Sequence, residues 1–111
     1  MLDYSCPCPV KATLNIIGGK WKWLIYRELY FKGIRRFGEI ETGIPGISAK
    51  VLTEALKEME ADGLITRTVY AEVPARVEYE LTEAGMSLEK VFMAMIDWGN
   101  HFLSKQYSFP E

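Results

Sequence analysis

Two thiols near the start of the chain offer the most direct covalent chemistry. Cys6 and Cys8 lie two residues apart, separated by Pro7. A disulfide between them in one chain would close a very small ring, so we expect none. No other cysteine exists to complete a zinc site. Each thiol can instead react with an oxidant or electrophile, and Lys11 near Cys8 would favour the reactive thiolate. Otherwise Cys8 is simply a small apolar side chain.

A second segment carries groups suited to contacting DNA. Five polar residues follow a helical spacing and would share the exposed side of one helix, namely Ser48, Lys50, Thr53, Glu54 and Lys57. Lys50 and Thr53 are three apart and therefore adjacent on a helix surface. Such groups can read base edges, whereas Glu54 costs affinity near phosphate unless it accepts a hydrogen bond from a cytosine amino group. The alternative is an ordinary solvated helix face.

The charge of the chain is unevenly distributed. The net charge is −2, yet residues 11–57 hold nine basic and four acidic residues, a net +5. Residues 58–111 hold four basic and ten acidic residues, a net −6. This asymmetry is compatible with one face turned toward phosphate and another turned away from it.

Particular cations are predicted to hold DNA phosphates. They are Lys20, Arg35, Arg36, Lys57 and Arg76. For three of these residues, an ion pair is the alternative. Arg35 and Arg36 could pair with Glu39 or Glu41, and Arg76 beside a hairpin turn could be neutralised by Glu72 or Glu78.

The bulk composition excludes several classes of protein. At 111 residues and 49% hydrophobic content, the chain is expected to form one ordered domain. Its apolar stretches are far shorter than the roughly 20 residues of a membrane span, and its start lacks the features of a secretory signal, so we expect a cytoplasmic protein. With one histidine, no nucleophile paired with a base at a recognisable spacing, no phosphate loop and no metal-ligand cluster, we expect no enzyme, metal or cofactor.

The elements that must position these groups follow from the apolar spacing. Short helices are predicted over residues 10–17, about 20–30 and about 36–42, followed by a glycine- and proline-rich turn at residues 42–46. Ser48 can cap the next helix, which is predicted to end at Asp62-Gly63. This helix would bury its apolar residues in the core: Val51, Leu52, Leu56 and Met59.

A hairpin and a terminal helix complete the pattern. Period-two alternation predicts strands over residues 64–71 and 76–81, joined by a connection whose tip is Val73, Pro74 and Ala75. From Thr82 the helical period returns and continues to Leu103. A terminal helix this apolar needs a partner to cover it. We expect a second copy of the chain to do so, with Val10–Ile17 contributing to the same dimer contact.

This order of elements predicts a mainly α fold with a small β-hairpin (α+β), a winged helix-turn-helix. The helix-turn-helix occupies about 36–62, the wing about 64–82, and dimerisation segments about 8–18 and 83–106. The dimer contacts are assigned to Val10, Leu14, Ile17, Leu88, Val91, Phe92, Met95, Trp98 and Phe102.

Several short motifs resemble the HxlR-type family of winged-helix regulators, within the MarR-like group, over nearly the whole chain. They include Cys8-Pro9-Val10, Ile17-Gly18-Gly19-Lys20-Trp21, Arg36-Phe37-Gly38-Glu39-Ile40, Pro45-Gly46-Ile47-Ser48, Glu60-Ala61-Asp62-Gly63-Leu64-Ile65, Val77-Glu78-Tyr79-Glu80-Leu81-Thr82 and Trp98-Gly99. The resemblance implies a homodimer, paired through its terminal helices, on an inverted-repeat operator. It also implies that Cys8 senses oxidants or electrophiles.

One departure from the family bears on that sensing. This chain adds Cys6 and has no cysteine in its later helices. A bridge between protomers must therefore join their N-termini, or Cys8 must pair with a small-molecule thiol.

The sequence thus predicts a sequence-specific DNA-binding transcriptional regulator. We expect a homodimeric repressor whose partners are double-stranded DNA, its own second copy and an oxidant or electrophile. Two alternatives stay open. A winged helix used only for protein contacts would show no salt-sensitive DNA binding, and a dithiol redox protein would turn over thiols without DNA.

Overall fold

The computed structural model describes residues 8–103, so Cys6 and the end of the expected 83–106 dimerisation segment lie outside it. Along the chain the elements are α1 (Pro9–Ile17), α2 (Lys22–Lys32), β1 (Arg35–Arg36), α3 (Phe37–Gly43), α4 (Ala49–Ala61), β2 (Ile65–Tyr70), β3 (Arg76–Leu81), α5 (Glu83–Ser87) and α6 (Glu89–Phe102). The α+β class predicted from the sequence is confirmed, with most element ends within two residues of the prediction.

The core lies where α2, α3 and α4 meet the base of the hairpin. Ile25 of α2, Ile40 of α3 and Leu52 of α4 are fully buried, and Ile65 of β2 closes the core from the sheet side. Ser48 caps α4 as predicted, because its Oγ accepts the backbone N–H of Val51 at 3.1 Å. The apolar periodicity and the cap therefore place α4 against the core with a defined start.

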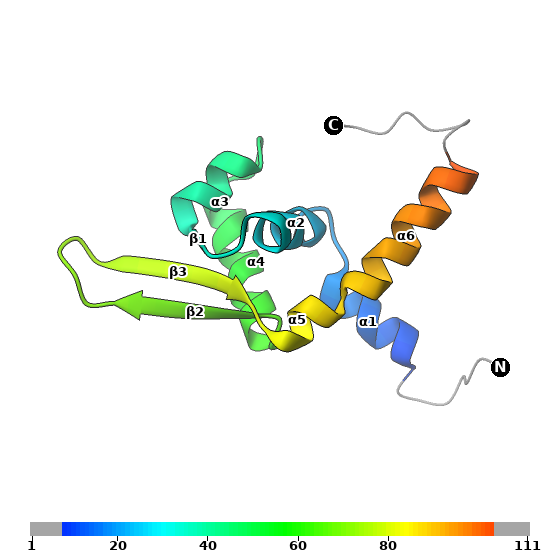
Figure 1. Cartoon of the computed structure of the whole chain (residues 1–111), viewed down its shortest axis with the longest axis horizontal. Coiled ribbons are helices and arrows are strands. Elements are labelled where there is room, and N and C mark those ends of the chain that lie inside the picture. Colours follow the sequence, from blue (N-terminus) through cyan, green and yellow to red (C-terminus); the bar gives the residue numbers. More distant parts are fainter. Residues whose placement is uncertain (1–7, 104–111) are drawn as a thin grey trace.

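The sheet has three antiparallel strands in the order β1-β3-β2. The β2–β3 ladder runs from Ile65 opposite Leu81 to Tyr70 opposite Arg76, and the hairpin projects beyond the helices (Figure 1). The sequence did not predict β1, whose two residues pair with Tyr79 and Glu78 of β3. This short strand ties the end of α2 to the sheet just before α3 begins.

The C-terminal part is two helices, so the single helix predicted from Thr82 onward is wrong. Thr82 does begin a helix, since its Oγ1 accepts the N–H of Gly85 at 3.0 Å. That helix, α5, ends at Ser87, and Leu88 is both its C-cap and the N-cap of α6, which begins at Glu89. Apolar spacing is the same on either side of Leu88, so it carries no sign of the break.

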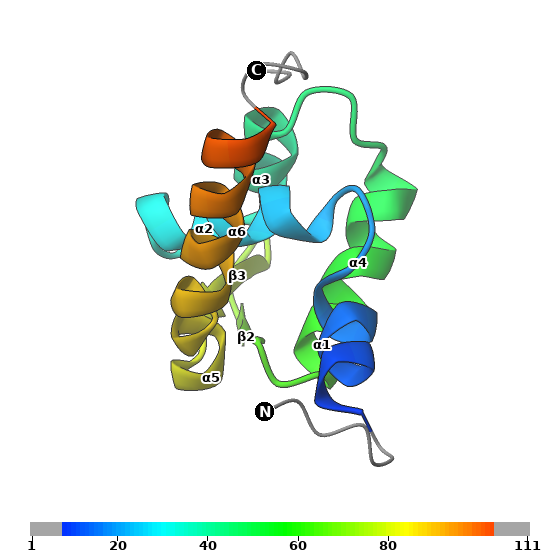
Figure 2. The same cartoon turned by 90° about the vertical axis from the view of Figure 1, so that its right-hand side faces the viewer.

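An aromatic cluster joins α6 to the core. The Phe92 ring lies 4.8 Å from that of Trp23 and 4.6 Å from that of Tyr26, measured between ring centroids. The helices α1 and α6 lie at the opposite end of the molecule from the hairpin (Figures 1 and 2), and residues of both line one groove. Among the described residues, no helix is long and apolar enough to cross a membrane.

Gly85 provides a test of how closely α5 packs against the backbone at Leu64. A Cβ there would collide with the backbone carbonyl of Leu64, so Gly85→Ala is expected to cost on the order of 1–3 kcal/mol of unfolding free energy. Gly38, in α3, has no atom near an added Cβ, and Gly38→Ala should raise stability by up to about 1 kcal/mol. Thermal unfolding at one protein concentration compares the two; equal effects would contradict the packing described.

Candidate nucleic-acid interface

The polar face of α4 points to solvent along its length. Ser48, Lys50, Thr53, Glu54 and Lys57 are all exposed. Leu52, Ala55, Leu56 and Met59 occupy the opposite side and are buried. The Thr53 hydroxyl donates to the carbonyl of Ala49 at 2.7 Å, which leaves its oxygen able to accept a hydrogen bond. The face therefore presents ammonium groups together with hydroxyl and carboxylate acceptors.

The turn before α4 holds it at an angle to α3. Ile44 and Ile47 on either side of the turn are buried and anchor it to the core. Between them Gly46 has a φ of 91°, a backbone conformation that residues other than glycine rarely adopt. The helices α3 and α4 are thus joined by a short turn whose two ends are anchored in the core.

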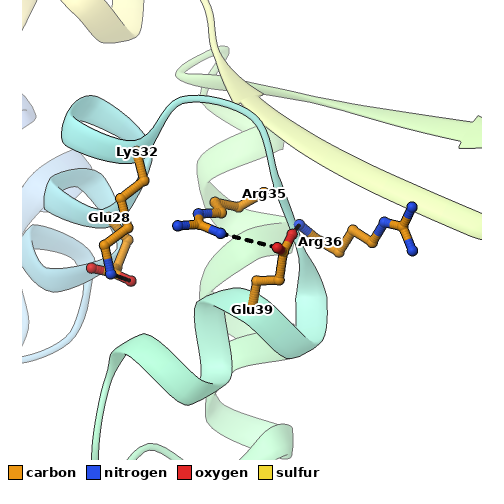
Figure 3. A network of polar contacts seen from close by, with 5 residues as sticks. All are labelled: Glu28, Lys32, Arg35, Arg36 and Glu39. Carbon is orange, nitrogen blue, oxygen red and sulfur yellow. Dashed lines mark hydrogen bonds and ion pairs between the residues drawn. The ribbon is translucent and has the colours of Figure 1, made fainter.

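The two arginines of β1 point in different directions, as Figure 3 shows. Arg35 is half-buried and its Nη1 lies 2.9 Å from a carboxylate oxygen of Glu39. The same carboxylate caps α3, since it accepts the backbone N–H of Arg36 at 2.9 Å. The Arg36 side chain is exposed and extends away from this network. Of the two sequence alternatives, the ion pair thus forms at Arg35.

A buried carboxylate lies beside this network. Glu28 is only 5% exposed and pairs with Lys32 at 3.0 Å (Figure 3). Its carboxylate packs so closely on Gly43, at the end of α3, that a Cβ there would overlap it. Sequence reasoning missed Glu28, because a charged residue on a helix is expected outside; Lys32 one turn later was the available signal. This contact fixes α2 against α3.

The remaining cations predicted at phosphates differ in their surroundings. Arg76 lies over the Tyr70 ring at 4.1 Å and pairs with Glu72 at 3.3 Å and Glu78 at 3.6 Å. Lys20 is exposed, 4.7 Å from the centre of the Trp21 ring. The wing-tip residues are exposed, as expected at a hairpin turn: Val73, Pro74 and Ala75.

The segments predicted to dimerise present apolar side chains to solvent. Exposed members are Val10, Leu14, Met95, Trp98 and Phe102. Ile17 and Phe92 are buried within the single chain, and Leu88 and Val91 are half-buried, so these four support the surface from beneath. An apolar groove of about 480 Å³ between α1 and α6 continues the same surface.

Cys8 lies at the first turn of α1. It is half-buried, takes the N-cap position and makes no capping hydrogen bond with its side chain. It forms no disulfide within the described residues. In that part of the chain no group of histidine, cysteine and carboxylate side chains gathers that could hold a metal ion.

Three core helices, a tight turn before an outward polar helix face, and a projecting hairpin define a winged helix-turn-helix protein. A family model described as HxlR-like helix-turn-helix matches residues 16–107. The chain belongs to this family.

Relatives and solved structures agree with this membership. The HTH-type transcriptional regulator YdeP of Bacillus subtilis is 47% identical over 105 residues, covering 91% of this chain and 81% of its own. The redox regulator HypR in its reduced form superposes with a TM-score of 0.80 at 42% identity, covering 89% of this chain and 99% of HypR. Diamide-treated YodB from B. subtilis gives a TM-score of 0.76 at 39% identity, covering 90% and 97%.

The capping carboxylate of Glu39 predicts a pH dependence. Its pKa is lowered, mainly by the backbone N–H of Arg36 and further by the Arg35 guanidinium. A lowered pKa in the folded state stabilises the fold above the unfolded value of about 4.3, and that contribution is lost as pH falls through the folded value. Glu39→Gln keeps an oxygen acceptor but does not titrate. The free energy of unfolding, measured with urea between pH 7 and about 3, should therefore fall less steeply with pH for this variant than for the wild type. Parallel pH dependences of the two proteins would refute this role of Glu39.

Proposed function

We propose that this DNA-binding transcriptional regulator acts as a homodimer, with one α4 helix in the major groove at each half of an inverted repeat. The observation that carries the proposal is the exposed polar face of α4, directly opposite its buried face. In winged helix-turn-helix proteins the helix after the turn enters the major groove and reads base edges near its start. Ser48, Lys50, Thr53 and Glu54 lie in the first half of α4 or at its cap and are the proposed readers.

Phosphate contacts would orient the protein on the duplex without reading sequence. Arg36, exposed at the start of α3, is the best placed of the proposed cations, and Lys20 and Lys57 are likewise exposed. Arg35 and Arg76 would each have to exchange a carboxylate partner for a phosphate. We therefore expect them to contribute less than Arg36.

The second copy would cover the apolar surface of α1 and α6. Monomeric proteins rarely leave a contiguous surface of this kind in water. A two-fold axis through this surface would repeat α4 on the other protomer, and half-sites one turn apart require about 34 Å between the two helices. Symmetry of the protein would then match an inverted repeat in the DNA.

Regulation through Cys8 is the second part of the proposal. The structural relative HypR is a redox regulator, and the structure of YodB is that of the diamide-treated protein. Two thiols, either the Cys8 pair of a dimer or Cys8 and a small-molecule thiol, would lose two protons and two electrons to the oxidant as their disulfide forms. Since Cys8 begins the helix that carries Val10 and Leu14, this bond would alter dimer geometry and the spacing of the α4 helices.

The variants Lys50→Ala and Arg36→Ala separate the recognition of base sequence from the binding of phosphates. Lys50→Ala should relax the preference among base sequences, whereas Arg36→Ala should weaken all duplexes alike and reduce the salt dependence by about one unit of slope per protomer. Titrations of fluorescent duplexes from upstream of the protein's own gene and of scrambled sequence, at two salt concentrations, measure both effects. Two chains per duplex are expected.

Three results would count against this assignment. Unchanged discrimination in Lys50→Ala would remove α4 as the reading helix. One chain per duplex would remove the homodimer. Failure of the wild type to bind any duplex at low salt would favour a winged helix used for protein contacts.

Cys8→Ser tests the redox step. Diamide should release the wild-type protein from its operator and leave Cys8→Ser bound, because the variant cannot form the disulfide. Cys6→Ser is the matched control and should respond like the wild type. Release of Cys8→Ser by diamide would rule out Cys8 as the sensor.

A further inference from the structure

We propose that a hollow between α4 and the hairpin is a seat for a DNA phosphate, held by Lys57 and Arg67. This inference rests on the proposed DNA binding and adds a residue, Arg67, to it. The hollow has a volume of about 360 Å³, and its lining comes from both elements: Thr53, Leu56, Lys57, Glu60, Arg67 and Tyr79.

The register of the hairpin explains how Arg67 reaches α4. Arg67 of β2 lies directly opposite Tyr79 of β3, and such partners share one face of a sheet. Tyr79 is buried, so this is the face that covers the helices. Ile65, Arg67 and Val69 alternate along the same face. Arg67 therefore lies on the helix side of the hairpin, just where the hairpin leaves the core, and its side chain is exposed.

The two cations of the hollow are uncommitted. Lys22, Lys32, Arg35 and Arg76 each have a carboxylate within ion-pair distance, whereas within residues 8–103 neither Lys57 nor Arg67 has one. Glu60 also lines the hollow and opposes an anion there. With two cations and one carboxylate, the hollow keeps a net positive charge.

The position of the hollow matches the path of a DNA strand. When α4 occupies the major groove and the hairpin lies beside the duplex, one sugar-phosphate strand must pass between them. A guanidinium and an ammonium on opposite walls of that passage can hold a phosphate oxygen from both sides. Arg76, farther out on the same hairpin, is already paired with Glu72 and Glu78.

Arg67→Gln tests the seat without requiring a known operator. Phosphate contacts ignore sequence, so a labelled duplex of arbitrary sequence and about 30 base pairs, nearly three turns, is a sufficient probe. Arg67→Gln should bind it more weakly and lower the salt slope by about one unit per protomer. Between about 50 and 200 mM salt, the affinity of the wild type should then fall by about fourfold more per protomer than that of the variant.

Three further variants make the result specific. Arg67→Lys keeps the charge and should keep the slope, and Glu60→Gln should tighten binding, because it removes the opposing carboxylate. Lys90→Gln removes an exposed cation from α6 and should change nothing. If the wild type binds but Arg67→Gln keeps its affinity and slope, the seat is refuted and the proposed function stands. A wild type that binds no duplex at low salt overturns both.

Discussion

Burial of one side of α4 is the constraint on which the rest of the structure depends. Leu52, Leu56 and Met59 meet Ile25 and Ile40 in the core, and this packing fixes the rotation of α4 about its own axis. Because a helix turns every 3.6 residues, the polar positions between these apolar ones have no choice but to face outward. The surface proposed to contact DNA is thus held in place by the same contacts that stabilise the fold.

Neighbouring carboxylates decide which cations remain available. Formal charge makes residues 11–57 strongly basic, but Lys22, Lys32 and Arg35 are paired with glutamates. These pairs have structural roles, since Glu39 caps α3 and Glu28 holds α2 on α3. Among the cations without such partners in the described chain are Lys50 and Lys57 on α4, Arg36 at the start of α3 and Arg67 at the base of the hairpin. Local pairing therefore leaves the cations of α4 and of the hairpin base free of carboxylate partners within the described residues.

The sequence predicted the helices, the Ser48 cap and the hairpin, because each has a periodic pattern or a local hydrogen-bonding signal. It missed β1, since two residues are too short to show any period. The break at Leu88 has no local signal in the apolar spacing, so it too was missed. Arg67 was overlooked because an arginine in a strand is normally read as outward-facing. Its alternation with Ile65 and Val69 showed the contrary, but only the register with Tyr79 shows what it faces.

The short strand β1 constrains the number of residues in the linker that precedes it. Successive residues of a strand point to opposite faces, so Arg35 faces the helix side with Tyr79 while Arg36 shares the other face with Glu78. Losing or gaining one residue at Gly33 or Ile34 would exchange the two arginines, leaving Glu39 without its partner. A change of two residues would restore the faces. Evolutionary insertions and deletions in relatives should accordingly spare this linker and gather instead at residues 71–75, where the hairpin turn has no such register to keep.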